Sequence, residues 1–377
     1  MEPTKLVMTT TLWSENNSAS FSSSPTESPA STEWDLITAA IPPYIFTLCV
    51  FGILGNGFVL LVFLIHRDRL TTPEIYLSNL ALADFMLLVC LPFWAMYIYN
   101  HFSWSYGDAL CKLVNSSVIV NFYTSIYILA MISIDRYLAL VKTMKALWLR
   151  RTLYTKVICV ILWFFGLLMS LPTMVHRKVK FFEDHKTLSC ILDYDCSWKL
   201  THQISMNVAG FVLPVLVIAF CSGNIIRTLR KRSKSIYSQE ATDRKAIALV
   251  YAVTLLFILC WSPFQIFTFL DTLCDLNLLD EKRWSHTLDM GHQVSVYVAF
   301  LNSALNPVLY VFSGQYFRRK VNTIYRSARY RRRGSDMNTY QRSVISTFVN
   351  RTEQIKPVAL SNSRGSNGNM LHDTLPG

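Results

Sequence analysis

Seven long apolar segments limit what this chain can fold into more than any other feature. They cover residues 41–65, 76–99, 110–141, 157–175, 203–226, 246–273 and 292–312. A helix needs about 20 apolar residues to cross a bilayer, and each segment is close to that length or longer. With 52% hydrophobic and 16% charged residues, the chain is also too apolar for an ordinary soluble domain. We therefore predict an all-α membrane protein, a bundle of seven transmembrane helices.

The third segment is expected at the centre of this bundle. Between Leu113 and Ile134 it contains no charged residue, yet polar side chains such as Asn115, Asn121 and Ser125 are spread around the helix. In hydrocarbon such groups need hydrogen-bond partners from neighbouring helices. A central position would supply these partners.

The distribution of basic residues predicts the orientation in the membrane. The net charge is +12, but lysine and arginine gather beside the apolar segments, at residues 66–69, 142–156 and 227–245 and after residue 312. By the positive-inside rule these runs are cytoplasmic, which places the N-terminus outside the cell, as in a multi-pass protein of the plasma membrane. Asn16 begins a glycosylation sequon, as suits an extracellular tail. Basic runs of this kind give no reason to expect nucleic-acid binding.

Composition divides the chain into the bundle, residues 39–313, and three smaller regions. Residues 1–38 are rich in Ser, Thr, Pro and Glu and are expected to be a disordered extracellular tail. Residues 314–326 have apolar and basic faces, which predicts a short amphipathic helix on the lipids of the inner membrane surface. Residues 327–377 are polar and are expected to be a disordered cytoplasmic tail.

Asp84 is an ionisable residue deep within the second segment. A buried carboxylate in a membrane is costly unless it is paired, and is therefore a candidate functional site. Oxygen ligands suit a small hard cation such as sodium, and we expect no other cofactor. The alternative is a protonated Asp84 that only hydrogen-bonds its neighbours. The candidate sodium ligands are Asp84, Asn121, Ser125, Asn302, Ser303 and Asn306.

Charges at the two membrane faces suggest a switch and a binding site. At the inner face, Arg136 can pair with the adjacent Asp135 or, across the bundle, with Asp243, and such a pair could act as a switch. The alternative is a solvated charge pair that contributes under about 1 kcal/mol and switches nothing. At the outer face, acids outnumber bases around the connection between the sixth and seventh segments. Such a rim attracts cationic ligands, or only keeps the surface soluble. The acids of this rim are Asp271, Asp275, Asp280, Glu281 and Asp289.

Short motifs occur in chain order, at least one in each segment, and together they resemble the rhodopsin-like G-protein-coupled receptors over residues 41–325. The motifs are Gly55-Asn56, NLALAD ending at Asp84, Cys111, Asp135-Arg136-Tyr137, Trp163, Pro214, Cys260-Trp261-Ser262-Pro263 and Asn306-Pro307-Val308-Leu309-Tyr310. Longer strings resemble the bradykinin receptors, nearest the second subtype, which prefers the intact kinin. These strings are EIYLSNLALAD at 74–84, LPFWA at 91–95, SIDRYLALVKTM at 133–144 and CWSPFQIFTFLDTL at 260–273.

The resemblance implies a nonapeptide ligand with arginine at both ends. Its first arginine would meet Asp271 and Asp289, and Arg177 would lie near its C-terminal carboxylate. Ile119 stands where the inducible subtype has a lysine, whose charge would repel the last arginine. Lys199 stands where the family would have an acid near that arginine. The implied ligand-binding residues are Asp271, Asp289, Arg177, Trp261, Ile119, Gln293 and Tyr297.

The resemblance also implies activation of heterotrimeric G proteins, of the Gq class with calcium release. The implied switch residues are Asp135, Arg136, Tyr137, Asp243, Pro214, Ile126, Phe257, Trp261, Asn306, Pro307 and Tyr310. Phosphorylation of the C-terminal tail by receptor kinases would then recruit arrestin, because each phosphate adds about −1.5 to −2 of charge. The candidate acceptors are Ser335, Thr339, Ser343, Ser346 and Thr347.

Four of the nine cysteines lie outside the apolar segments. Cys111 opens the third segment on the oxidising side and Cys190 lies between the fourth and fifth segments, so we expect a disulfide that fixes this loop across the pocket mouth. Two free thiols are the alternative. A second bridge, from Cys196 to Cys274, is a further hypothesis, which requires Cα atoms within about 7 Å.

Other functions fit the residues less well. A transporter or channel could use Asp84 in an ion path, but the chain shows no internal repeat and no second buried charge for a relay. An enzyme is not expected, because the segments lack a nucleophile-base arrangement or metal-ligand spacing. Among receptors, one for angiotensin or a chemokine is the main alternative to a kinin receptor.

Overall fold

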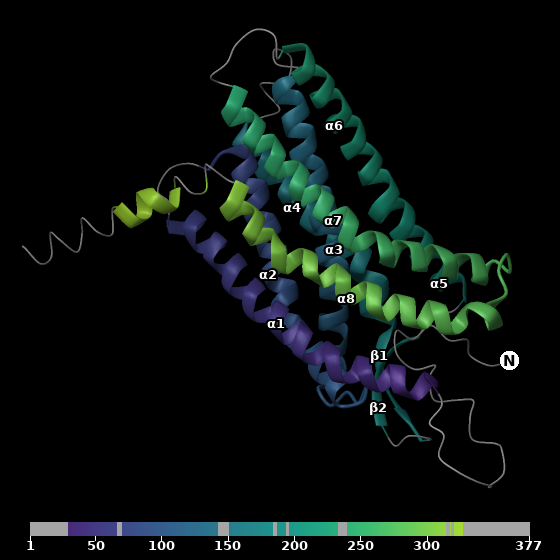
Figure 1. Cartoon of the computed structure of the whole chain (residues 1–377). Coiled ribbons are helices and arrows are strands. Elements are labelled where there is room, and N and C mark those ends of the chain that lie inside the picture. The colour runs from purple at the N-terminus through teal and green to yellow at the C-terminus, as the bar shows by residue number, and fades with distance from the viewer. Residues whose placement is uncertain are drawn as a thin grey trace, which may run out of the picture. The chain divides into compact units, whose positions relative to one another are not determined.

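A computed structural model describes residues 29–65, 70–141, 151–183, 187–193, 196–232, 240–313, 317 and 320–326. The chain divides into two units, residues 1–322 and 323–377. In the second unit the described residues, 323–326, are helical. The first unit is a helical bundle with one β-hairpin (Figure 1). Its elements are α1 (Pro29–Ile65), α2 (Thr72–Tyr99), α3 (Gly107–Leu140), α4 (Thr152–His176), β1 (Arg177–Phe182), β2 (Thr187–Leu192), α5 (Cys196–Asn207), η1 (Val208–Val212), α6 (Leu213–Arg232), α7 (Glu240–Asp275) and α8 (Glu281–Ser313).

Six helical stretches in the described residues are long and apolar enough to cross a membrane. They are Thr38–Ile65, Thr72–Tyr99, Gly107–Leu140, Thr152–His176, Trp198–Arg230 and Val250–Asp275. Six of the seven predicted spans are thereby confirmed. α8 covers the seventh predicted segment but begins earlier, at Glu281, and includes charged residues in its first turns.

The distribution of side chains is the one that a lipid environment favours. Large apolar residues such as Phe51, Val160 and Phe164 are about seven-tenths exposed on the outside of the bundle, whereas Asn56 and Asp84 are fully buried. In water this arrangement would expose extensive apolar surface, but in a bilayer it places hydrocarbon against hydrocarbon. The polar interior is therefore the place to look for function.

α3 lies at the centre, as predicted, and packs against α2, α4, α6 and α7. Its polar side chains find the predicted partners on neighbouring helices only in part. Asn115 and Ser133 donate to carbonyls one turn earlier in α3 itself, because a short polar side chain in a helix can reach the i−4 carbonyl. Asn121 instead bonds to α2, through Asp84.

A π-helical turn interrupts the fifth span where Pro214 follows. Proline has no amide hydrogen, so the carbonyl four residues earlier, at Gly210, loses its usual donor. The turn η1 precedes this proline, and the carbonyl of Ala209 accepts a hydrogen bond from the Tyr127 hydroxyl of α3 at 2.9 Å. The irregular turn before Pro214 is thus joined to the central helix.

The segment between α4 and α5 forms an antiparallel hairpin of β1 and β2, in which Val179 pairs with Cys190. The Trp104 amide donates to Leu188 at 2.7 Å, which fixes the hairpin to the loop before α3. We call this end of the bundle, where Cys111 and the hairpin lie, the disulfide end. The opposite end, at the C-terminus of α3, is called the Arg136 end.

Part of the predicted amphipathic helix is described. Phe317 and residues 320–326 are helical. The Phe317 ring makes edge contacts with Phe58 and Phe63 of α1, and Lys320 forms a 2.8 Å ion pair with Glu74 of α2. Several predicted features lie outside the described residues. They are Asn16, the tail acceptors Ser335, Thr339, Ser343, Ser346 and Thr347, and the side chains of Cys196, Asp243 and Tyr310.

Candidate functional site

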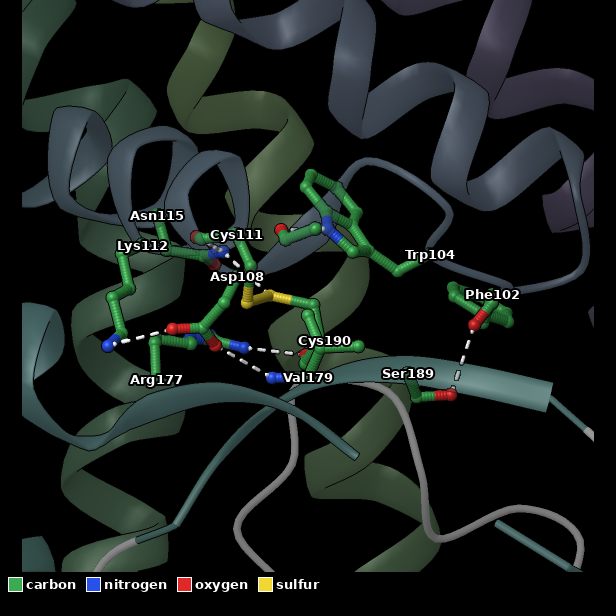
Figure 2. Close-up of a disulfide and its surroundings, with 11 residues drawn as sticks. Phe102, Trp104, Asp108, Cys111, Lys112, Asn115, Arg177, Val179, Ser189 and Cys190 are labelled. Carbon is green, nitrogen blue, oxygen red and sulfur yellow. Dashed lines mark hydrogen bonds and ion pairs between the residues drawn. A yellow bond between two sulfur atoms is a disulfide. The ribbon is translucent and has the colours of Figure 1, made fainter. Parts of the chain in front are cut away.

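The predicted disulfide between Cys111 and Cys190 is present and joins α3 to β2, with Cα atoms 5.8 Å apart (Figure 2). Two polar contacts reinforce it. The Asp108 carboxylate at the start of α3 accepts a hydrogen bond from the Val179 amide at 3.1 Å, and the Arg177 guanidinium donates to the Cys190 carbonyl at 3.0 Å. The hairpin is therefore held across the disulfide end by covalent and polar links.

Arg177 was expected near a ligand carboxylate. In the structure it is 4% exposed and bonds the backbone of the opposite strand. Beyond β2, Lys178 and Asp193 form an ion pair, and Lys178 is the main cause that holds the pKa of Asp193 below its ordinary value. The basic residues of the hairpin are thus largely engaged in holding the hairpin itself.

The second disulfide hypothesis stays a prediction, because the side chain of Cys196 lies outside the described residues. Cys274 is a buried free cysteine within the described part of α7. Nearby, α5 and α7 are joined by charge, because Lys199 of α5 reaches the carboxylates of Asp271 and Asp275. This ionic contact links α5 to α7 at the disulfide end.

Asp271, Asp275, Lys199 and Gln203 form a polar group at the disulfide end, which we call the acid cluster. The Lys199 ammonium lies 2.8 Å from Asp275 and 3.6 Å from Asp271, and Gln203 donates to the other oxygen of Asp271 at 2.6 Å. The charged side chains are only 11–17% exposed. Asp289 of α8 lies close enough for its charge to act on Asp271. The predicted acids are therefore brought together, with a lysine that sequence reasoning had assigned elsewhere.

Beneath the acid cluster lies a set of stacked aromatic rings. Trp261 packs against Phe122 of α3 with ring centroids 4.5 Å apart, and against Phe257 at 5.9 Å. All three rings are at most 1% exposed. Phe257 and Trp261, both implied switch residues, thus pack with Phe122, which the sequence did not single out. Ile126 is buried one turn further along α3.

Gln265 lies between the acid cluster and these rings. It lies one turn above Trp261 and two turns below Thr272, and residues at this spacing share one face of a helix. The Thr272 hydroxyl contacts Gln203 of α5 at 3.4 Å, so this face of α7 points into the bundle. Its side chain is 4% exposed, and neither amide atom has a hydrogen-bond partner among the described residues. An unpartnered buried amide is rare and is a candidate ligand contact.

The other predicted ligand-binding residues lie on the walls. Ile119 is buried on α3 at 9% exposure. On α8, the Tyr297 hydroxyl donates to Gln293 at 2.8 Å, and the Tyr44 hydroxyl of α1 donates to the Tyr297 carbonyl at 3.0 Å. The first bond lies within α8, and the second joins α1 to α8.

Asp84 is fully buried and is bonded on both oxygens. Asn121 donates to one oxygen at 3.0 Å and Asn306 to the other at 2.7 Å, which links α2, α3 and α8. Ser303 also lies against the carboxylate. Several buried oxygens here lack a hydrogen-bond partner within the described ranges, which is the donor chemistry that a hard cation needs. They belong to Asn56, Asn121, Ser125, Asn302 and Asn306.

At the Arg136 end, the guanidinium of Arg136 pairs with the adjacent Asp135 at 3.2 Å. Asp135 is 5% exposed, so this pair is more sheltered than a surface pair. The Tyr137 ring lies 5.9 Å from Phe220 of α6. At the α8 motif, a Cβ on Gly55 would lie 2.9 Å from the Pro307 ring, so glycine is what lets α1 approach this proline closely.

Comparison with known proteins agrees with this arrangement. The family model for the seven-transmembrane receptors of the rhodopsin family matches residues 55–310. A B2 bradykinin receptor of Oryctolagus cuniculus is 42% identical over 79% of this chain and 82% of its own length. The B2 bradykinin receptor of Homo sapiens is 42% identical over 75% and 73% respectively. The chain belongs to the bradykinin receptors of the rhodopsin family.

This membership settles the broad class of the protein. It is a multi-pass plasma-membrane receptor and not an enzyme. A B1 bradykinin receptor of Macaca fascicularis is 37% identical over 84% of this chain and 91% of its own length. The higher identity with the B2 relatives agrees with the resemblance read from the short strings.

Proposed function

We propose that this receptor binds a short cationic kinin peptide outside the cell and activates a heterotrimeric G protein inside it. The observation that carries the proposal is the acid cluster, whose partly buried carboxylates lie at the disulfide end above an aromatic core. Burial reduces screening by salt, so a ligand cation gains more there than at an exposed rim. Relatives that are 37–42% identical to this chain are named bradykinin receptors.

The proposal includes α8 as the seventh span and an extracellular N-terminus. α8 contains Asn302, Ser303 and Asn306, which are about 1% exposed. Polar residues turned inward lower the apolar content of a helix without exposing polar groups to lipid. The disulfide supports an extracellular position for its end of the bundle, because disulfides form in oxidising compartments.

The peptide is proposed to bind along α7 from the acid cluster toward the aromatic core. An N-terminal arginine would bond Asp271 with Asp289 nearby, because a guanidinium forms strong, geometrically defined bonds with carboxylates. A peptide unit presents one N–H and one C=O, which match the unpartnered oxygen and nitrogen of Gln265. Contact with Trp261 would then alter its packing on Phe122.

The response is proposed to travel along α7. Pro263 lies two residues beyond Trp261, and a proline in a helix removes a hydrogen bond and permits bending. Bending there would shift the part of α7 near the Arg136 end and free Arg136 from Asp135 to meet the G protein. The proposed partner is of the Gq class, with release of calcium as the cellular signal.

A sodium ion at Asp84 is proposed as a regulator. The residues that would hold it are Asp84, Asn121, Ser125 and Asn306, with Asn302 and Ser303 beside them. The ion would supply the positive charge that neutralises the carboxylate. The side chains themselves link α2, α3 and α8, so their geometry would favour one relative position of these helices.

Signalling is proposed to end when receptor kinases phosphorylate Ser343, Ser346 and Thr347 and arrestin binds. These acceptors are close together in the sequence beside Arg342. Replacing all three with alanine should reduce arrestin recruitment while G-protein activation is kept. Unchanged recruitment in that variant would contradict the assignment of this cluster.

The direct test of function is calcium release in cells that express the receptor. Intact kinin, kinin lacking its last arginine, angiotensin and a chemokine should be applied over a concentration series. The proposal expects the intact kinin to be the most potent, and no response in cells without the receptor. A response to angiotensin or the chemokine at lower concentration than to either kinin would overturn it.

A further inference from the structure

Lys199 and Asp275 are charged partners inside the acid cluster, and they differ in how each relates to Asp271. The ammonium of Lys199 bonds Asp275 at 2.8 Å, within hydrogen-bond distance, and lies 3.6 Å from Asp271, beyond it. Asp271 is bonded on its other oxygen by the neutral amide of Gln203. Two carboxylates and one ammonium leave one negative charge, and the distances assign most of it to Asp271.

We propose that Asp275 is a positioning residue that holds Lys199 away from Asp271 and so keeps Asp271 available to a cation of the ligand. The inference rests on the proposed peptide function and names the residues that set its affinity. Lys199 acts as an internal competitor for the same carboxylate, and Asp275 determines how strongly it competes.

The geometry makes this competition sensitive to single substitutions. The gap between Lys199 and Asp271 exceeds the Lys199–Asp275 bond by less than 1 Å, and a lysine side chain has four flexible carbons. If Asp275 lost its charge, the nearest carboxylate for Lys199 would be Asp271. Because these side chains are at most 17% exposed, water would not fully screen the new pair.

Two single variants should change kinin affinity in opposite directions, and a double variant tests whether the two residues act together. Asp275→Asn should weaken binding of a kinin with an N-terminal arginine, because Lys199 then occupies Asp271. Lys199→Met should strengthen it, because no internal cation remains. The expected change is about tenfold in each direction, which is typical for gain or loss of one partly buried charged contact. The double variant should bind within about threefold of Lys199→Met, since Asp275 has nothing left to hold.

A matched control is available on α3. Lys112 pairs with Asp108 at 2.9 Å at the same end of the bundle, with both side chains at least 35% exposed. Lys112→Met removes the same charge without touching the acid cluster. It should change kinin affinity by less than about twofold, as expected for an exposed pair.

The experiment is equilibrium binding of full-length kinin and of kinin lacking its first arginine to the intact receptor in membranes. The proposal expects the affinity changes given above for the full-length kinin, and little change in affinity for the kinin that lacks its first arginine. Asp275→Glu keeps the charge and should bind like the unmodified receptor, which separates the proposal from simple misfolding.

Three results would overturn the inference. If Asp275 contacted the ligand itself, the double variant would bind much more weakly than Lys199→Met, because the two effects would then add. If Lys199 bound a ligand carboxylate, Lys199→Met would weaken both peptides. Equal strengthening by Lys112→Met would show only a long-range charge effect. Failure of the unmodified receptor to bind kinin would instead refute the proposed function, and so the two failures are distinguishable.

Discussion

Replacing Gln265 with methionine should make the ligand-free receptor more stable and its ligand bind more weakly. A buried polar group without a partner costs about 1–3 kcal/mol, and both amide atoms of Gln265 lack a described partner. Methionine has a similar length and no amide to satisfy. We therefore expect the free energy of unfolding to rise by about 1–3 kcal/mol.

The same substitution removes two neutral hydrogen bonds from the proposed peptide contact. Each is worth about 0.5–1.5 kcal/mol, so kinin affinity should fall between about fivefold and a hundredfold. Thermal inactivation of detergent-solubilised receptor measures the first effect, and equilibrium binding measures the second. At about 2–4 °C per kcal/mol for a domain of roughly 200 residues, the midpoint should rise by several degrees.

Gln203 provides a matched control, since it is also 4% exposed but its amide is bonded to Asp271 and Thr272. Gln203→Met should lower the inactivation midpoint, because it leaves those partners unsatisfied. If Gln265→Met also lowered the midpoint, the reasoning from its unpartnered amide would be refuted. If the midpoint rose but kinin affinity did not change, Gln265 would not be a ligand contact.

Three further predictions test other parts of the site. Asp271→Asn and Asp289→Asn should each weaken full-length kinin by about 1.5–3 kcal/mol, and together by less than the sum, with little effect on kinin lacking its first arginine; equal losses for both peptides in a binding assay would contradict this. Asp84→Asn should abolish any effect of sodium concentration on kinin affinity, measured against potassium at equal ionic strength, and a persisting sodium effect would place the ion elsewhere. Replacing Cys111 and Cys190 with serine should cost about 2–5 kcal/mol of stability and lower binding at the cell surface, whereas unchanged binding and thermal inactivation would show that the bridge is dispensable.

Features set by local sequence could be predicted well. Hydropathy predicted seven spans, six of which are confirmed among the described residues, and the polar content of the third segment identified the central helix. The pairing of Cys111 with Cys190 followed from the side of the membrane on which a helix start and a connecting loop lie. The gathering of Asn121 and Asn306 around Asp84 followed from their depth along their own helices. In each case the membrane reduces the possible arrangements, because polar groups must turn inward and helices must alternate in direction.

Features that depend on the relative rotation of two helices could not be predicted. Lys199 pairs with acids on α7 because α5 faces α7 there. The π turn before Pro214 changes the direction in which the side chains of α6 point relative to those of α5. A residue inserted into a helical turn in this way leaves no mark in composition. The hairpin of β1 and β2 was also missed, although Val179 and Phe181 alternate with lysines in the manner of a strand.

α7 shows how these parts depend on one another. Asp271 and Gln265, the proposed ligand contacts, lie on the disulfide-end side of Pro263, whereas Phe257 lies on the other side. Pro263 cannot donate to the carbonyl of Leu259, so the helix is least constrained between the two groups. Above this point α7 is joined to α5 through charge, and below it to α3 through stacked rings. A ligand cation that competed for the charged link would therefore act on the part of α7 above Pro263, across the missing hydrogen bond from the core.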